Sequence, residues 1–104
     1  MAKANSIASE KKEKSAKILT TEFRLQAPGA KKVCLAGDFN EWDETGFRIR
    51  RYKGGVFIKK LALESGRYEY KFLVDGAWII DPENPVTQPN EFGSENSVIV
   101  VNNR

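Results

Sequence analysis

The chain has 104 residues, of which 40% are hydrophobic and 11% are aromatic. This length allows one domain with one modest hydrophobic core, and it excludes a catalytic barrel or a doubly wound sheet. The formal net charge is +3, from 17 Lys and Arg against 14 Asp and Glu, and it demands no strongly charged partner.

The N-terminal end differs in composition from the rest of the chain. Residues 1–19 are mainly Ala, Ser, Lys and Glu, with almost nothing to bury, and the lysines of this stretch account for the excess of positive charge. We predict a disordered basic tail over residues 1–19 and a single domain over residues 20–104. Contact of these lysines with a membrane or a nucleic acid is the less favoured alternative.

No apolar run near the N-terminus reaches the length of a signal-peptide core, and none elsewhere reaches that of a membrane span. Cys34 is the only cysteine, so no intramolecular disulfide can form, and a buried thiol in a reducing compartment is expected. These observations predict a cytoplasmic protein.

From Thr21 onward, apolar and polar residues alternate, and turn residues recur every eight to twelve positions, which is typical of an antiparallel β-sandwich. Phe23, Leu25 and Ala27 form the apolar face of a first strand that ends at Pro28. Residues 32–37 predict a second, antiparallel strand. Its continuous apolar run indicates a central strand that is covered on both faces.

Further strands are predicted at residues 47–52 and 56–63, joined by a glycine hairpin, and the irregular alternation at Lys59 and Lys60 indicates a bulge. Residues 67–74 alternate most regularly. The predicted core face of this strand consists of Tyr68, Tyr70, Phe72 and Val74, and its other face consists of Glu69, Lys71 and Leu73.

Asp75 and Gly76 predict a two-residue hairpin turn, because glycine supplies the positive φ that this turn needs. The turn pairs Leu73 with Trp78, and so Trp78 lies on the face opposite the core, together with Lys71. That face either forms a platform for a ligand or packs against the second sheet, and the register alone does not decide.

Two features remain ambiguous from local pattern. Residues 81–96 form a long loop with three prolines, and loops of this length in compact domains are usually functional. Trp42 stands on the polar turn GDFNEWD, where its ring is either core that reaches back under the turn or a surface handle for a ligand. A last short strand follows at residues 97–101.

The motifs VCLAGDFNEWD, GVFIKKLALESGRYEYKFLVDGAW, DP and GSENSVIVV, in this order, resemble the glycogen-binding domain of the AMP-activated protein kinase β subunit and the wider carbohydrate-binding module family 48. Isoamylases and branching enzymes carry the same early-set domain ahead of their barrel. The resemblance covers residues 20–101. It implies an all-β, immunoglobulin-like antiparallel sandwich that binds α-1,4-linked glucans such as glycogen, starch or maltodextrin without cleaving them.

The resemblance also implies a set of sugar-binding side chains. Indole rings suit the C–H faces of pyranoses, and an amine or an amide can hydrogen-bond the hydroxyl rim. Phe92 stands where the kinase subunit has a leucine, on a loop that is slightly longer here. The expected carbohydrate-binding residues are Trp42, Lys71, Leu73, Trp78, Phe92, Ser94 and Asn96. We expect a monomer with no metal or other cofactor, and an α-glucan as its partner, with no nucleic acid and no membrane.

The sequence also bears on three other classes of function. An enzyme is disfavoured because the chain has no His and its aspartates mostly occupy turn positions. A nucleic-acid site would use Arg48, Arg50, Arg51 and Lys53 beside Tyr52, and its affinity would fall steeply with salt. The alternative to a free-standing binding module is an accessory or regulatory domain of a glycoside hydrolase, branching enzyme or kinase complex, used mainly for protein contacts.

Overall fold

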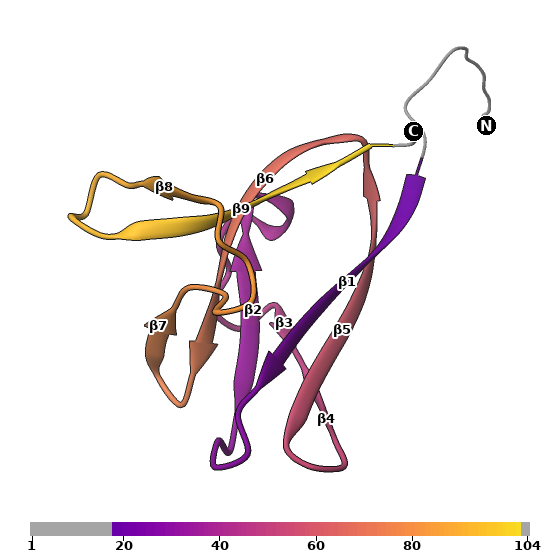
Figure 1. The fold of residues 1–104 in the computed structure, drawn as a ribbon, viewed down its shortest axis with the longest axis vertical. Helices are drawn as coiled ribbons and strands as arrows, with labels where there is room; N and C mark the ends of the chain where they lie inside the picture. The colour runs from indigo at the N-terminus through magenta and orange to yellow at the C-terminus, as the bar shows by residue number, and fades with distance from the viewer. Residues whose placement is uncertain (1–17, 103–104) are drawn as a thin grey trace.

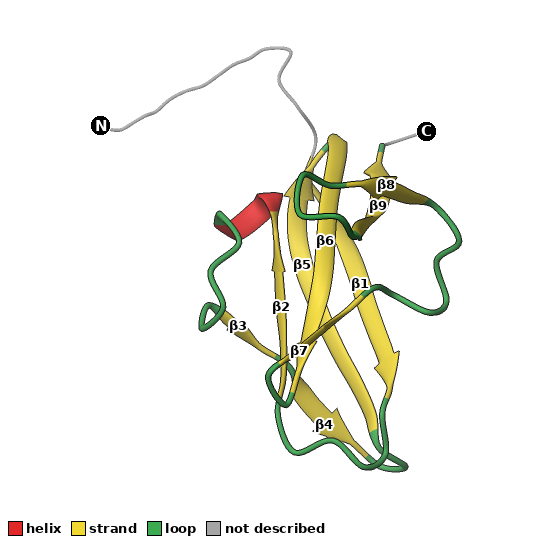
Figure 2. Ribbon diagram, turned by 90° about the vertical axis from the view of Figure 1, so that its left-hand side faces the viewer, coloured by secondary structure: helices red, strands yellow, loops and turns green. Residues whose placement is uncertain are grey.

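The computed structural model describes residues 18–102 and consists of two antiparallel β-sheets packed against each other (Figures 1 and 2). The smaller sheet has the strand order β1-β5-β4, with β1 at Ile18–Gln26, β5 at Val56–Glu64 and β4 at Arg50–Tyr52. The larger sheet has the order β3-β2-β6-β9-β8, with β7 also paired to β6. Its strands are β2 (Val33–Gly37), β3 (Phe47–Arg48), β6 (Gly66–Val74), β7 (Ala77–Ile79), β8 (Thr87–Pro89) and β9 (Glu95–Val101). The predicted all-β, immunoglobulin-like sandwich is confirmed.

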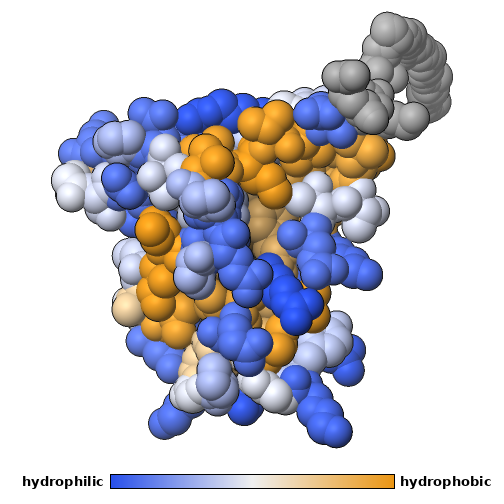
Figure 3. Space-filling view, in the orientation of Figure 1, coloured by the Kyte–Doolittle hydropathy of each residue, from blue (hydrophilic) through white to orange (hydrophobic). Residues whose placement is uncertain are grey.

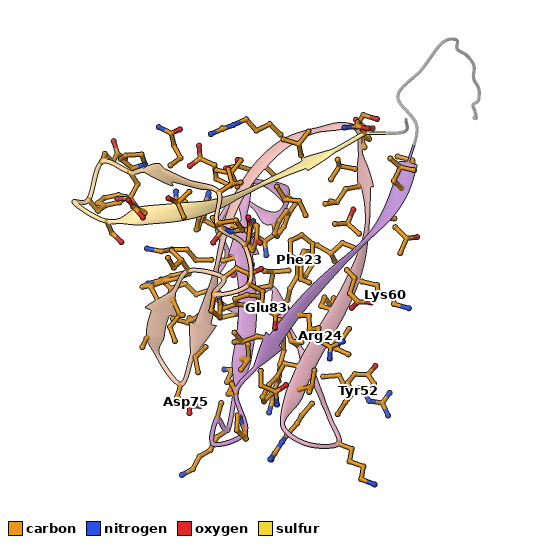
Figure 4. The ribbon with its side chains drawn as sticks, viewed as in Figure 1. Phe23, Arg24, Tyr52, Lys60, Asp75 and Glu83 are labelled. Atoms are coloured by element: carbon orange, nitrogen blue, oxygen red, sulfur yellow. The ribbon has the colours of Figure 1, made fainter. Side chains whose placement is uncertain are left out.

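The core between the sheets is built from one face of each strand. Phe23 of β1 and Phe57 of β5 meet Leu35 of β2 and Phe72 of β6, and none of these side chains is more than 2% exposed. Figure 4 shows the alternation along β1, where Phe23 points toward the core and Arg24 points away from it. Burying each such side chain contributes about 1.5–3 kcal/mol, so these aromatic and aliphatic contacts hold the two sheets together.

Strand β6 is the central element of the larger sheet. One of its edges pairs with β2 along Tyr70–Val74, and the other pairs with β9 along Gly66–Tyr70 and with β7 along Phe72–Val74. Since side chains alternate across a strand, Tyr70 and Phe72 enter the core while their neighbours stand on the outer face. The predicted assignment of the two faces of this strand is confirmed.

A buried polar network ties the chain that follows β7 to the central strand. The Tyr70 hydroxyl donates to Oδ2 of Asp81 over 2.7 Å, and the Asp81 backbone amide donates to Oγ of Ser97 over 2.8 Å. Asn84 adds a hydrogen bond from Nδ2 to the Tyr70 oxygen. Burial and the neighbouring Asp81 carboxylate raise the pKa of Tyr70, which keeps its hydroxyl protonated as the donor. The beginning of the predicted long loop is therefore fixed.

Several boundaries differ from the sequence-based expectation. β1 begins at Ile18, two residues before the predicted start of the domain, and residues 1–17 of the predicted tail lie outside the described part of the chain. The first two strands do not pair with each other, because β1 pairs with β5 and β2 pairs with β3 and β6. The predicted strand at 47–52 divides at the buried Ile49 into β3 and β4, which belong to different sheets.

The predicted bulge at Lys59 and Lys60 is wrong, because β5 pairs with β1 in one unbroken register from Ile18–Glu64 to Gln26–Val56. Lys59 occupies an inward-facing position between Phe57 and Leu61, and its Nζ lies 5.6 Å from the centre of the Phe47 ring. A lysine with its ammonium over an aromatic ring can replace an apolar residue without a change of register. The break in the apolar alternation at Lys59 is therefore explained by its packing against Phe47, and not by a bulge.

The turn between β6 and β7 is the predicted hairpin, with positive φ at both Asp75 (47°) and Gly76 (88°). Leu73 faces Trp78 and Phe72 faces Ile79, as predicted. The Asp75 carboxylate, at the tip labelled in Figure 4, accepts hydrogen bonds from the backbone amides of Lys31 and Lys32 at 2.8–3.1 Å. These amides hold the pKa of Asp75 below its ordinary range.

Asp75→Asn tests the role of this carboxylate, because asparagine also tolerates the left-handed conformation but carries no charge. The lowered pKa means that the stabilisation is present above the unfolded-state pKa and is lost as the pH falls through the folded-state pKa. At neutral pH we expect the variant to unfold at a lower urea concentration than the wild type. At about pH 2, where the Asp75 carboxylate is protonated, both proteins should unfold at the same urea concentration. An equal deficit at both pH values would contradict this account.

Candidate functional site

The outer face of β6 supplies the floor of the candidate site. Lys71 and Leu73 alternate with the core residues of this strand, and the hairpin register brings Trp78 opposite Leu73. In β9, Ser97 pairs with Tyr70 on the core side, so its neighbour Asn96 stands on the same outer face as Lys71. Four predicted site residues thus come from three adjacent strands.

Trp42 reaches this face from the turn that follows β2. A 3₁₀ turn at Asp38–Asn40, visible at the end of β2 in Figure 2, is closed by hydrogen bonds from the Gly37 amide to Oδ1 of Asn40 and from the Trp42 amide to the Gly37 carbonyl. Gly37 has no room for a side chain, since a Cβ there would stand 2.5 Å from the carbonyl oxygen of Glu69. The turn therefore packs directly on β6.

The two indoles lie side by side on the surface. Their ring centroids are 6.3 Å apart and their planes are inclined by 60°. Trp78 is 41% exposed and Trp42 is half-buried, whereas Phe39 of the same turn packs against the core. Trp42 therefore lies at the surface and does not reach back into the core.

A groove of about 840 Å³ runs over these rings. Six of the seven predicted site residues line it, namely Trp42, Lys71, Trp78, Phe92, Ser94 and Asn96. The seventh, Leu73, is half-buried beside Trp78 and does not line the groove. The sequence interpretation missed four lining residues, Glu44, Glu69, Asn90 and Glu91. Glu69 could have been found from the strand alternation that placed Lys71.

The polar groups of the groove are held in fixed positions. Lys71 and Asn96 are only 8% and 9% exposed, and Nζ of Lys71 donates to Oγ of Ser94 over 2.9 Å. Nδ2 of Asn96 donates to Oε1 of Glu69 over 2.9 Å, while the other carboxylate oxygen of Glu69 pairs with Arg67. Donors restrained in this way lose little conformational entropy when a ligand binds.

Asn90 organises the loop that forms one lip of the groove. Its Oδ1 accepts hydrogen bonds from the amides of Phe92 and Ser94 at 2.9 and 3.1 Å, and its Nδ2 donates to Oδ1 of Asn96 over 3.0 Å. Phe92, at the tip, is 84% exposed. The predicted loop at 81–96 was expected to have no regular structure, but it contains the short strand β8, which pairs with β9, and β9 itself already begins at Glu95. Asparagine after proline is a turn signal that could have identified Asn90.

Metal ligands, membrane-spanning helices, exposed thiols and apolar surface patches are the other features that could point to a function. Within residues 18–102, no group of three or more His, Cys, Asp or Glu side chains is placed to hold a metal ion. The same part of the chain contains no helix long and apolar enough to cross a membrane. Cys34 is buried at 2% exposure. The space-filling view shows apolar surface only in separate patches between polar and charged side chains (Figure 3).

The β-sandwich carries two aromatic side chains at its surface beside ordered polar groups, an arrangement whose chemistry suits a carbohydrate. The family model for the glycogen recognition site of AMP-activated protein kinase matches residues 19–104. The chain therefore belongs to this glycogen-binding and starch-binding family, and the predicted family resemblance is confirmed.

The relatives include both kinase subunits and plant proteins. The 5'-AMP-activated protein kinase subunit beta-1 of Sus scrofa is 39% identical over 87 residues, which cover 84% of this chain and 67% of that protein. Protein PTST homolog 2 of Arabidopsis thaliana is 34% identical over 85 residues, and FLOURY ENDOSPERM 6 of Oryza sativa subsp. japonica is 38% identical over 89 residues. The chain spans only 15% and 16% of these two plant proteins.

A solved structure supports the fold independently. The maltogenic amylase from S. marinus matches 82% of this chain and 14% of its own, with a TM-score of 0.66 and 24% sequence identity. At this identity the likeness concerns the architecture alone. The same sandwich thus occurs as a small part of a larger protein.

The expected cytoplasmic location is wrong. The relatives from Arabidopsis and rice are both chloroplastic proteins, not cytoplasmic ones. The prediction rested on the lack of an apolar signal-peptide core. Plastid transit peptides are amphipathic and rich in Ser and Arg, so the absence of an apolar run carries no information about them.

Replacing Asn90 with alanine tests its role in the lip. The change removes the acceptor for the Phe92 and Ser94 amides and the donor to Asn96, so we expect faster hydrogen exchange at both amides. Asn90→Asp is the matched control, because its carboxylate still accepts from both amides but cannot donate to Asn96. Unchanged exchange in the alanine variant would show that the loop is held by other contacts.

Proposed function

We propose that this chain is a non-catalytic module that binds α-1,4-linked glucans in the groove over Trp42 and Trp78. The observation that carries the proposal is the pair of indoles, 6.3 Å apart and inclined by 60°, beside the restrained donors Lys71 and Asn96. Membership of a glycogen-recognition family supports the same ligand class.

The geometry suits the shape of the sugar. A pyranose presents a face of C–H groups with hydroxyls around its rim, so a flat indole buries the apolar face without desolvating the hydroxyls. Successive rings of an α-1,4-linked chain are inclined to one another because the chain curves. Two indoles whose planes meet at 60° match two inclined sugar rings better than two coplanar ones.

The polar groups divide the remaining work. Lys71 and Asn96 lie on the floor, where an ammonium and an amide hydrogen-bond hydroxyls at the edge of a sugar ring. Ser94 holds the Lys71 ammonium and reaches the ligand only from that position. Phe92 covers the ligand from the lip, and Leu73 supports Trp78 from below rather than touching sugar.

Absence of catalysis is part of the proposal. A glycosidase needs two carboxyl groups free to face each other about 5–10 Å apart across the scissile bond. Among the carboxylates that line the groove, Glu69 is engaged by Asn96 and Arg67, while Glu44 and Glu91 stand exposed at the rim. We infer that any enzyme activity resides in a protein to which such a module brings the glucan, as part of the same chain or as a partner.

The nucleic-acid alternative loses support from the arrangement of its residues. Arg48 and Arg50 belong to strands of different sheets. Arg51 donates to the Pro28 carbonyl, and the Arg50 guanidinium lies 5.5 Å from the centre of the Tyr52 ring. Arg50 and Arg51 are therefore already engaged in contacts within the fold, which weakens the case for them as phosphate ligands.

Alanine substitution of either indole tests the site directly. We expect Trp42→Ala and Trp78→Ala each to cost about 2 kcal/mol of binding free energy or more, which is about thirtyfold in affinity for β-cyclodextrin by isothermal titration calorimetry. Lys71→Met keeps the aliphatic stem and should cost about fivefold. Tyr52→Ala is the matched control, since this aromatic is also exposed but lies on the smaller sheet. If all variants bound β-cyclodextrin with the affinity of the wild type, the groove would be excluded as the binding site.

The salt dependence of binding distinguishes the glucan from a polyanion. A neutral sugar releases no counterions, so its affinity should stay within about a factor of two between roughly 50 and 200 mM salt. A nucleic acid bound through several phosphates would lose orders of magnitude over the same range. Titration of maltoheptaose and of an oligonucleotide at both salt concentrations makes this comparison, and a steep salt slope for the sugar would contradict the proposal.

A further inference from the structure

The turn that carries Trp42 is strained. Glu41 and Trp42 are consecutive non-glycine residues in the left-handed region, with φ values of 57° and 60°. This conformation is unfavourable for bulky side chains and persists only where surrounding contacts hold it. The strain falls on the residue that presents one of the two indoles, so the contacts that maintain it decide where that ring points.

Asp38 makes the contacts that hold the ring. Its Oδ1 accepts a hydrogen bond from Nε1 of Trp42 over 3.1 Å, and its Oδ2 accepts from the backbone amide of Glu69 over 2.8 Å. One carboxylate thus connects the indole of the turn with the central strand β6. Hydrogen bonds to a charged acceptor are in general stronger than those between neutral groups.

The two indoles are positioned by different means. Trp78 is held through the register of the β6–β7 hairpin, and no hydrogen bond of its indole nitrogen is found among the described residues. Trp42 is held by a hydrogen bond at the edge of its ring, and this bond covers neither face of the ring. The angle of 60° between the rings therefore depends on the bond from Trp42 to Asp38.

We infer that Asp38 is a positioning residue that fixes the angle between the indoles, and that this angle favours a glucan already curved over a flexible one of the same composition. The inference rests on the proposed function. A rigid ring of glucose units fits only one inclination of the aromatic surface, whereas a linear chain can adjust its torsions when the indole turns. Preorganised surfaces gain most with preorganised ligands, because neither partner loses conformational entropy.

Two variants separate this role from general stability. Asp38→Ala removes both hydrogen bonds of the carboxylate. Trp42→Phe removes the indole donor together with part of the stacking surface, and leaves the bond between Asp38 and the Glu69 amide in place. Asp43→Asn is the control, because the Asp43 carboxylate lies just after the same turn and, among the described residues, accepts hydrogen bonds only from Thr45.

The affinity ratio of β-cyclodextrin to maltoheptaose is the readout, since these probes are the cyclic and linear forms of the same number of glucose units. We expect Asp38→Ala to weaken β-cyclodextrin roughly tenfold and maltoheptaose about twofold, so that the ratio falls about fivefold. Partial unfolding would lower both affinities equally and leave the ratio unchanged. Asp43→Asn should keep the wild-type ratio.

Circular dichroism gives a second measurement on the free protein. Two indoles at this separation couple excitonically, and the sign and size of the resulting couplet depend on their mutual angle. The couplet should collapse in Asp38→Ala and persist in Asp43→Asn. In the Trp42→Phe background, adding Asp38→Ala should not change the affinity ratio further, because the donor to the carboxylate is already gone.

The outcomes keep the two proposals distinct. If the wild type binds neither sugar at millimolar concentration, the proposed function falls and this inference falls with it. If the wild type binds both sugars and Asp38→Ala keeps the ratio and the couplet, the function stands and the positioning role is overturned. A ratio that falls in Asp38→Ala but not in Trp42→Phe also overturns it, because the effect would then come from the Glu69 bond.

Discussion

The backbone pairing of β6 on both of its edges is the constraint on which the other features depend. Bonded to β2 on one side and to β9 and β7 on the other, this strand cannot slip or rotate, so its alternation is permanent. Tyr70 and Phe72 commit one face to the core, and Lys71 is thereby committed to the groove. The register of this one strand therefore fixes both which side chains pack in the core and which line the groove.

Local chemistry made part of this predictable from the sequence. The Asp75-Gly76 turn has one favoured geometry, and that geometry alone places Trp78 opposite Leu73. The regular alternation of β1 and β6 likewise assigned their buried faces correctly. The positions of Trp42, Asn96, Phe92 and Ser94 came from the family resemblance, because no local rule brings a turn, a distant loop and the start of β9 to one strand.

The remaining features depend on contacts between segments far apart in the chain. Asp38 acts through an amide 31 residues away, and Lys59 is accommodated by the ring of Phe47 from another strand. The division of residues 47–52 between two sheets follows from the burial of Ile49, which a pattern of single residues does not reveal. Such side-chain contacts leave no periodic trace in composition, so sequence reasoning either missed them or, at Lys59, mistook one for a bulge.

The unequal anchoring of the groove has a consequence for its motions. The floor belongs to a strand that is hydrogen-bonded on both sides. The lip is held by fewer bonds, which are those of the Asn90 side chain, the backbone bond from Asn90 to Ser94 and the bond from Lys71 to Ser94, and Phe92 at its tip is almost wholly in solvent. Opening of the floor requires separation of the whole sheet, but the lip can open alone at little cost. In the proposed site, sugar would therefore enter and leave on the timescale of loop motion while the floor of the groove keeps its structure.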